Sequence, residues 1–285
     1  MTANPLGIHA LVWEGGWSAD QCERAVAATA RLGYDIIEIP AFDPVAMDAA
    51  MTRRTCEAHG ITPTISLGLS HDTDINSEDP ERVAAGREVL FQALEFARGI
   101  GAPYLGGVIF GALARYTAPA TDAARRNSAS VIRELAQEAA RDDITIGLEF
   151  VNRYESNLLN TAQQTLDFLD LVGEDNATVH ADVYHMNIEE TDYRTPILAC
   201  GDRLGYVHVG ESHRGYLGTG TIDFPEFFSG LRDIDYAGPI TFESFSSAVV
   251  DDNLTTTLAI WRDLWVDNDD LAAQARDFIR AGMAG

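Results

Sequence analysis

The chain has 285 residues, 46% of them hydrophobic, so it is long enough to bury a sizeable core. Its formal net charge of -24 repels nucleic acid and anionic membranes, which favours a small neutral ligand. All 20 basic residues are arginine, and the absence of lysine excludes a Schiff-base aldolase, attachment of pyridoxal phosphate and a P-loop phosphate site.

Strand-like and helix-like segments alternate along the chain. The apolar runs of strand length are GIHALVW (7–13), DIIEIP (35–40), ITPTISLG (61–68), APYLGGVIF (102–110), ITIGLEF (144–150), ATVHAD (177–182), LGYVHV (204–209) and GPITFE (238–243). Segments of helical spacing include Ala19 to Leu32, Pro80 to Gly101, Thr121 to Arg141 and Thr161 to Val172. A last helix is predicted from Leu254 to Ile279, with an interruption near Asp267 to Asp270.

About eight strand and helix pairs, in a chain close to the usual length of about 250 residues, predict an α/β fold of the (β/α)8 TIM-barrel type. The sequence contains no linker-like or low-complexity tract, so we expect one domain over residues 1–285. In such a barrel the carboxyl ends of all strands converge on one face.

Four strands of the second half end on residues able to hold a divalent metal. Glu149, Asp182, His208 and Glu243 stand at these ends. Any one acidic residue at a strand end is commonly a solvated loop residue. Four in register instead predict one metal centre, and three carboxylates with one imidazole suit Mn2+, or Co2+ or Mg2+, better than structural Zn2+.

The loops after these strands carry further polar groups. Glu155 follows the first of the four strands, His185 follows Asp182, and Arg214 lies in the glycine-containing loop after His208. Taken alone, each is either a solvated loop residue or a contact to a ligand above the metal.

The first half of the barrel is expected to supply an apolar wall. Trp13 is predicted to end the first strand, Ser66 and Leu67 the third, and Gly107 to Ile109 the fourth. His9 is either a packed core residue or part of this wall. His180, on the same strand face as Asp182, is expected to lie inside the barrel beneath the metal and not to be a fifth ligand.

Several stretches together resemble the ketose 3-epimerases, the D-tagatose, D-allulose (D-psicose) and L-ribulose 3-epimerase group of the xylose-isomerase-like barrels. They are LEFVNRYESNLLNT, DVYHMNIEE, YVHVGESHRGYLGTGTIDF, FESFSS and IWRDLWVDN, and the likeness extends to GIHALVW and SLGLS in the first half. Val183 is one local departure, at a position where the family more often has threonine.

The resemblance implies that Glu149, Asp182, His208 and Glu243 bind the metal. It also implies that Glu155, His185 and Arg214 hold a sugar at its O1 to O3 end, and the strand-end wall places His9, Trp13, Ser66 and Gly107 around the rest of the sugar.

The strand positions predict a two-base mechanism. Glu149 and Glu243 belong to separated strands, so they should approach a bound ketose from opposite sides, one removing the C3 proton and the other returning one. A metal held by O2 and O3 would stabilise the intervening enediolate, and no organic cofactor is required.

Other functions stay open. An aldose-ketose isomerase of the hydroxypyruvate isomerase type could use the same metal and both glutamates, and a sugar-binding barrel without turnover would keep the pocket alone. A DNA-repair endonuclease of related fold needs more histidines and a basic surface, which this chain lacks.

The resemblance places D-allulose/D-fructose first among the substrates, ahead of D-tagatose/D-sorbose and L-ribulose/L-xylulose. It also implies a homodimer or homotetramer. The sequence has no signal peptide or apolar stretch of membrane-spanning length, so we expect a cytoplasmic protein with no membrane or nucleic-acid partner.

Overall fold

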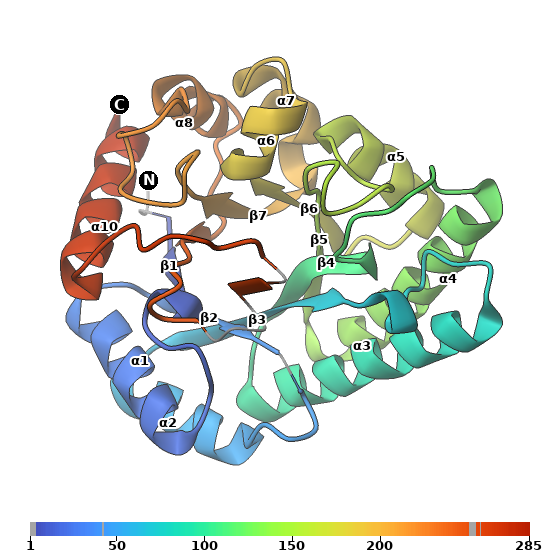
Figure 1. Ribbon diagram of the computed structural model, residues 1–285, viewed down its shortest axis with the longest axis horizontal. Helices are drawn as coiled ribbons and strands as arrows, with labels where there is room; N and C mark the ends of the chain where they lie inside the picture. Colours follow the sequence, from blue (N-terminus) through green and yellow to red (C-terminus); the bar gives the residue numbers. More distant parts are fainter. Residues whose placement is uncertain (1–3, 42, 251–254, 257) are drawn as a thin grey trace.

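Eight parallel strands close into a barrel in the computed structural model, which describes residues 4–41, 43–250, 255, 256 and 258–285. Each strand pairs with the next in chain order, and the last pairs with the first. They are β1 (Leu6–His9), β2 (Ile36–Pro40), β3 (Thr62–Leu69), β4 (Tyr104–Ala112), β5 (Thr145–Glu149), β6 (Ala177–Asp182), β7 (Leu204–Val209) and β8 (Ile240–Phe242). Figure 1 shows the strands at the centre with helices around them. The predicted (β/α)8 TIM barrel is confirmed.

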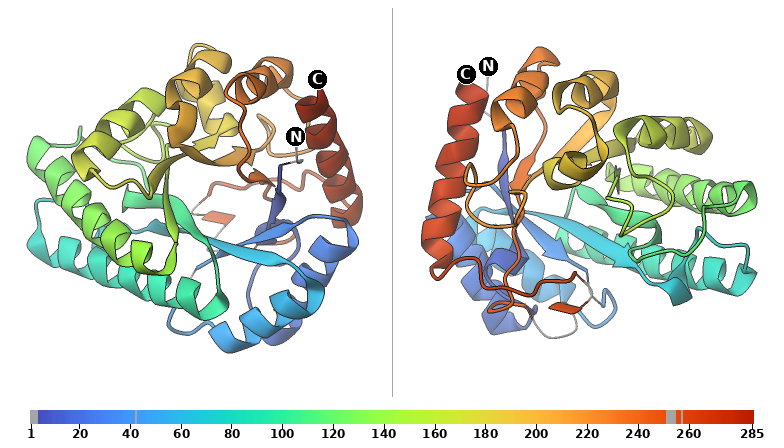
Figure 2. Two further views of the ribbon diagram at one scale, coloured as in Figure 1. Left: turned by 180° about the vertical axis from the view of Figure 1, so that it is seen from behind. Right: turned by 45° about the horizontal axis from the view of Figure 1, so that its top comes forward.

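The helices form an outer layer that covers the barrel. They include α1 (Ala19–Arg31), α2 (Ala49–His59), α3 (Pro80–Ile100), α4 (Asp122–Ala139), α5 (Ala162–Val172), α6 (Val183–Glu189), α7 (Arg194–Cys200), α8 (Phe224–Asp233) and α10 (Asn268–Ala284). Figure 2 shows α3 beside α4 and α8 beside α10, in agreement with their packing contacts. No helix within the described ranges has both the length and the apolar character needed to cross a membrane.

Local capping explains why several helices start and end close to their predicted positions. Ser18 caps α1 in a capping box with Gln21, each side chain accepting a hydrogen bond from the other's backbone N–H. Asp79 caps α3, whose first residue is Pro80, and Gly101 ends it in the left-handed conformation with φ of 75°.

Three predicted strand positions are wrong. β1 ends at His9, because the chain turns there into a short 3-10 helix, η1 (Ala10–Val12), so Trp13 does not end the first strand. β3 and β4 run beyond their predicted ends, since pairing continues past an irregularity next to Gly68 to join Leu69 with Ala112. Ser66 and Gly107 therefore lie within their strands and not at the ends.

The last helix is not continuous as predicted, because Thr255 and Thr256 are helical but residues 258–267 are not. Leu254 lies outside the described residues, and α10 begins only at Asn268, where the Asp267 side chain accepts hydrogen bonds from two backbone N–H groups of the first turn. The preceding segment, 258–267, is not helical and packs Ile260 and Trp265 into the structure. In Figure 1 this segment crosses in front of the barrel centre. Burial of Ile260 and Trp265 in this non-helical conformation, with Trp261 and Val266 exposed, outweighs the helical spacing of the segment.

An aromatic layer fills the barrel below the carboxyl ends of the strands. The rings of Tyr104 and Tyr206 stack with centroids 4.2 Å apart. The Tyr206 hydroxyl lies 2.7 Å from the Thr241 hydroxyl and 3.0 Å from that of Thr64. The Tyr104 hydroxyl occupies the space beside Gly147, where a Cβ atom would lie 1.7 Å from its oxygen.

We therefore expect Gly147→Ala to lower the free energy of unfolding by roughly 1–3 kcal/mol or more, because the added methyl group overpacks a filled layer. Thermal unfolding of the variant measures this cost. In a Tyr104→Ala background the same substitution should cost much less, since the colliding hydroxyl is gone. Equal costs in the two backgrounds would contradict this packing argument.

Candidate active site and metal centre

The structure brings the four predicted metal ligands together. Glu149 ends β5, Asp182 ends β6, His208 is the penultimate residue of β7, and Glu243 directly follows β8. One ligand atom from each lies within 4.8 Å of those of the other three, and all four side chains are buried. Residues spread over 95 positions of sequence, from 149 to 243, thus meet at one point of the barrel mouth.

The donor set of this cluster fits a divalent cation. His208 Nδ1 lies 3.1 Å from a Glu149 oxygen and 3.5 Å from a Glu243 oxygen. Three buried carboxylates with oxygens within 4.8 Å of one another repel unless positive charge lies between or beside them. Oxygen-rich sets of this kind suit Mg2+ and Mn2+, and imidazole also suits other first-row metals.

The cluster holds protons more tightly than exposed groups do. Burial raises the pKa of Glu149 to about 8; His208 opposes that shift, while the carboxylates of Glu243 and Asp182 add to it. Burial disfavours the charged form of His208, but Glu38, Glu243 and Glu149 outweigh it and raise the His208 pKa well above its usual value. A cation that binds here must displace these protons.

Arg214 lies over the cluster on the loop between β7 and α8. Its guanidinium is 2.7 Å from a Glu243 oxygen and 3.4 Å from an Asp182 oxygen, and it stacks 3.8 Å above the Tyr184 ring. Burial opposes its charge, but the carboxylates of Glu243 and Asp182 raise the Arg214 pKa above its usual value. Arg214 therefore stays positively charged beside two of the four predicted ligands.

The backbone of this loop is held by a buried carboxylate. Glu211 accepts hydrogen bonds from the backbone N–H groups of Ser212 and Gly218, at 2.7 and 2.8 Å. Its carbonyl oxygen accepts from the N–H of Arg214, whose own carbonyl accepts from the Ser244 hydroxyl. Arg214 adopts a left-handed φ of 60°, which is rare for a residue other than glycine. The loop thus fixes the direction of the arginine.

Asn152 connects the two other polar residues predicted above the metal. Its backbone and side-chain nitrogens lie 3.1 and 2.9 Å from His185 Nδ1, and its amide also donates to Glu155 at 2.7 Å. Because Nδ1 accepts a backbone N–H, neutral His185 carries its proton on Nε2, which lies 3.5 Å from Asp182. Burial lowers the His185 pKa to about 3, so His185 offers a neutral N–H donor.

A cavity of about 440 Å³ opens beside the cluster, a size typical of sites for small molecules. Its polar side is formed by Glu149, Glu155, His185, Arg214 and Glu243. The remaining lining residues are His9, Leu11, Pro40, Ala41, Ser66, Leu67, Gly68, Leu69, Ser70, Gly107, Val108, Leu113, Val151, Phe245 and Leu258. The cavity is therefore charged on one side and mainly apolar on the other.

The predicted wall residues divide into two groups. His9, Ser66, Leu67 and Gly107 line the cavity. Trp13 does not belong to its lining, because its indole N–H donates to the Thr29 hydroxyl on α1 at 3.1 Å. The strand end on which its predicted place rested is thus corrected, while its contact with a ligand stays a prediction.

The sequence reasoning missed several residues of the site. Glu38 lies beneath His208, and Asn152 joins His185 to Glu155. A charged residue inside the apolar run DIIEIP was a signal for Glu38, and the position of Asn152 three residues after Glu149 was a weaker one. Phe245 and Leu258 stand after β8 at positions outside regular helices and strands, which the periodicity does not predict.

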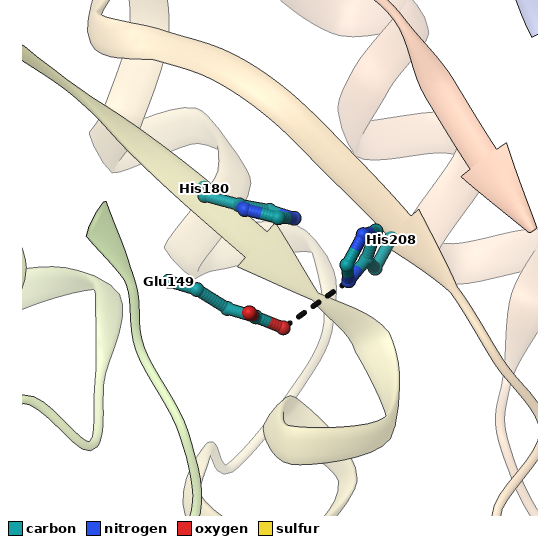
Figure 3. Close-up of side chains that lie close together, drawn as sticks. All are labelled: Glu149, His180 and His208. Carbon is teal, nitrogen blue, oxygen red and sulfur yellow. Dashed lines mark hydrogen bonds and ion pairs between the residues drawn. The ribbon is translucent and has the colours of Figure 1, made fainter. Parts of the chain in front are cut away.

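His180 lies inside the barrel next to the cluster, as predicted. Figure 3 shows His180 and Glu149 on neighbouring strands, both extending toward His208, with the Glu149–His208 contact dashed. The His180 and His208 rings meet edge to face with centroids 4.1 Å apart. Neither His180 nitrogen has a hydrogen-bond partner among the described residues, and burial lowers its pKa well below the usual value. Geometry alone would allow a His180 nitrogen to join Glu149 and His208 around an ion.

Comparison with known proteins places this architecture in a family. A family model described as xylose isomerase-like TIM barrel matches residues 26–281. The chain belongs to this family. The chain is 52% identical over 274 residues to the L-ribulose 3-epimerase of Methylomonas sp. (strain DH-1). The alignment covers 96% of each chain. It is 46% identical over 275 residues to the ketose 3-epimerase of Arthrobacter globiformis, covering 96% of this chain and 95% of the relative.

A solved structure extends the similarity to three dimensions. The D-allulose 3-epimerase from Methylomonas sp. in complex with D-allulose has a TM-score of 0.96 and 51% sequence identity, over 98% of this chain and 97% of that one. The resemblance to ketose 3-epimerases, which are isomerases, is therefore confirmed.

We expect the affinity of the cluster for Mn2+ to rise between pH 6 and pH 8.5. Below its pKa of about 8 Glu149 holds a proton that competes with the ion, and above that pKa the carboxylate is free to bind it. The affinity should rise up to about tenfold per pH unit for each proton displaced. Calorimetric titration measures this, and Glu149→Gln should show a shallower dependence. A flat profile in the unchanged protein would contradict the expectation.

Proposed function

We propose that this chain is a metal-dependent ketose 3-epimerase that acts on free ketoses, with Mn2+ as its cation and D-allulose/D-fructose as its preferred pair. The observation that carries the proposal is the convergence of Glu149, Asp182, His208 and Glu243 beside a cavity of about 440 Å³, whose wall includes Glu149 and Glu243. The names of the full-length relatives support the reaction, and the bound D-allulose in one solved relative supports the substrate.

The positions of the two glutamates support exchange of a proton between the faces of C3. Glu149 comes from β5 and Glu243 from the end of β8, with β6 and β7 between them in the closed ring. One carboxylate removes the proton from C3 and the other delivers a proton to the opposite face, and the roles reverse in the reverse reaction. When bound, the cation would supply Lewis-acid stabilisation of the negative charge that develops on the sugar oxygens.

The remaining polar residues support orientation of the sugar. His185 offers an N–H donor, Arg214 offers a fixed guanidinium, and Glu155 offers an acceptor at the same side of the cavity. Burial raises the Glu155 pKa above its usual value, which strengthens its binding to a hydroxyl donor. Together they supply complementary partners for adjacent oxygens of a ketose. The apolar side then packs against the distal carbons.

The proposal is tested by identifying which carbon of the sugar takes up hydrogen from the solvent. Each glutamate can exchange its proton with water between turnovers, so D-fructose incubated with the Mn2+-loaded protein in D2O should yield D-allulose with deuterium at C3. NMR of the product shows the position directly. Label at C1 or C2 would instead support an aldose-ketose isomerase. An unlabelled C3 epimer would exclude two-base exchange, and no product from any of the candidate ketoses would favour a binding protein.

The metal requirement is tested in the same experiment. Protein stripped with a chelator, and verified as metal-free by elemental analysis, should lose the exchange, and added Mn2+ should restore it. Full turnover without metal would contradict the proposed mechanism.

Arg214→Ala should lower kcat/KM by roughly 10- to 100-fold, because a charged hydrogen bond to the sugar contributes about 1.5–3 kcal/mol. The metal content of the variant should stay intact, since Arg214 contacts two of the ligands but is not one of them. Arg214→Lys is the matched control, as it keeps the charge and loses the planar fork. Steady-state kinetics with elemental analysis measures both effects. Unchanged kinetics in Arg214→Ala would remove this residue from the sugar site.

A further inference from the structure

Glu38 is a carboxylate buried in the interior of the barrel. It lies in the middle of β2, within the otherwise apolar stretch IIEIP, and its side chain is 0% exposed. Burying a carboxylate costs several kcal/mol unless charged or hydrogen-bonding groups compensate it. Its neighbours must therefore explain why a charge stands at this position.

Two histidines face the two oxygens of Glu38. One oxygen lies 2.8 Å from Nε2 of His208, and the other lies 3.8 Å from Nε2 of His9. The oxygen that faces His9 makes no hydrogen bond in the described part of the chain, and the Tyr206 hydroxyl is a further neighbour of the Glu38 carboxylate. Glu38 therefore lies between a proposed metal ligand and a residue of the cavity wall.

The contact with Glu38 selects one form of His208. An ionised carboxylate only accepts hydrogen bonds, so Nε2 of His208 must carry the proton. In the neutral ring the lone pair is then on Nδ1, which lies 3.1 Å from Glu149 and 3.5 Å from Glu243. The nitrogen that faces the cluster is thus the one able to bind a cation.

The contact with His9 follows the same logic. Nδ1 of His9 accepts the backbone N–H of Leu11 at 3.2 Å, so the neutral ring carries its proton on Nε2. That nitrogen faces both Glu38 and the Ser66 hydroxyl, which is 3.5 Å away. The Glu38 carboxylate therefore faces both His208, a predicted metal ligand, and His9, a residue that lines the cavity.

We propose that Glu38 is a positioning residue of the metal centre, which holds His208 with Nδ1 toward the cation and Nε2–H bound to its own carboxylate. This inference rests on the metal centre of the proposed function. It adds a residue to the four predicted ligands. Glu38 contacts Nε2 of His208, whereas Glu149 and Glu243 lie nearer to Nδ1 of the same ring. Hydrogen-bonded carboxylates of this kind orient histidine ligands and raise their basicity.

The test compares Mn2+ binding by the unchanged protein and by Glu38→Gln. The amide keeps the size of the side chain but removes the charge, so the dissociation constant for Mn2+ should rise roughly 10- to 100-fold. Asp74→Asn is the matched control. Asp74 is also a buried carboxylate, but it accepts hydrogen bonds from Asn76, Ala112 and the Tyr116 hydroxyl. Its variant should bind Mn2+ as tightly as the unchanged protein.

The outcomes separate the two proposals. If the unchanged protein binds Mn2+ and Glu38→Gln binds it equally well, Glu38 has no positioning role, while the metal centre stands. If the unchanged protein itself fails to bind Mn2+, both the metal centre and this inference are overturned. Equal weakening in Glu38→Gln and Asp74→Asn would indicate general damage by amide substitution and would also overturn the inference.

A second measurement needs no Glu38 variant and so remains decisive if Glu38→Gln does not fold. Long-range 15N–1H NMR of the unchanged protein loaded with diamagnetic Zn2+ reports which nitrogen of each imidazole carries a proton, and the His208 signals are assigned by their loss in His208→Asn. We expect His208 with its proton on Nε2 and its Nδ1 shifted by the metal. A proton on Nδ1 would overturn the inference.

Discussion

The structure depends on holding several carboxylates at one buried place. Glu149, Asp182 and Glu243 lie close enough to share one ion, in a region that water does not solvate freely. Positive charge must compensate them, and the chain supplies part of it through His208 and Arg214. Arg214 needs a loop of unusual backbone conformation, and His208 needs an acceptor on its other side. The loop after β7 and the charge inside β2 therefore follow from one electrostatic requirement.

The scaffold meets this requirement because the charged groups stand at strand ends or on a loop held by hydrogen bonds. Strand ends supply the acidic groups, while side chains such as Glu211 and Asn152 hold loops through hydrogen bonds to backbone N–H groups or to imidazole. Beneath them, the stacked rings of Tyr104 and Tyr206 leave little free space. Side chains fixed from below and from the side lose little further freedom when a ligand binds, which favours affinity and correct geometry.

The sequence predicted the parts of the site that follow from barrel symmetry. Residues at the ends of parallel strands must converge, so the motifs around Glu149, Asp182, His208 and Glu243 were sufficient to predict their meeting. It did not predict Glu38, because a side chain inside a strand meets partners from distant strands that periodicity does not identify. It misplaced Trp13, since a hydrogen bond within η1 ends β1 early. It also carried the last helix through residues 258–267, where Ile260 and Trp265 are buried in a non-helical conformation.

The two sides of the cavity come from different parts of the chain. Glu149, Glu155, His185, Arg214 and Glu243 all belong to the second half, whereas Leu11, Leu67, Val108 and most of the apolar lining belong to the first. The charged groups and most of the apolar lining are thus encoded in separate stretches of the gene. Substitutions of first-half wall residues such as Leu67 and Val108 can alter which distal groups fit, provided that Glu38 keeps its contact with His208. A barrel divided in this way can diversify its substrates by drift or by directed evolution of one half, without rebuilding the reaction centre in the other.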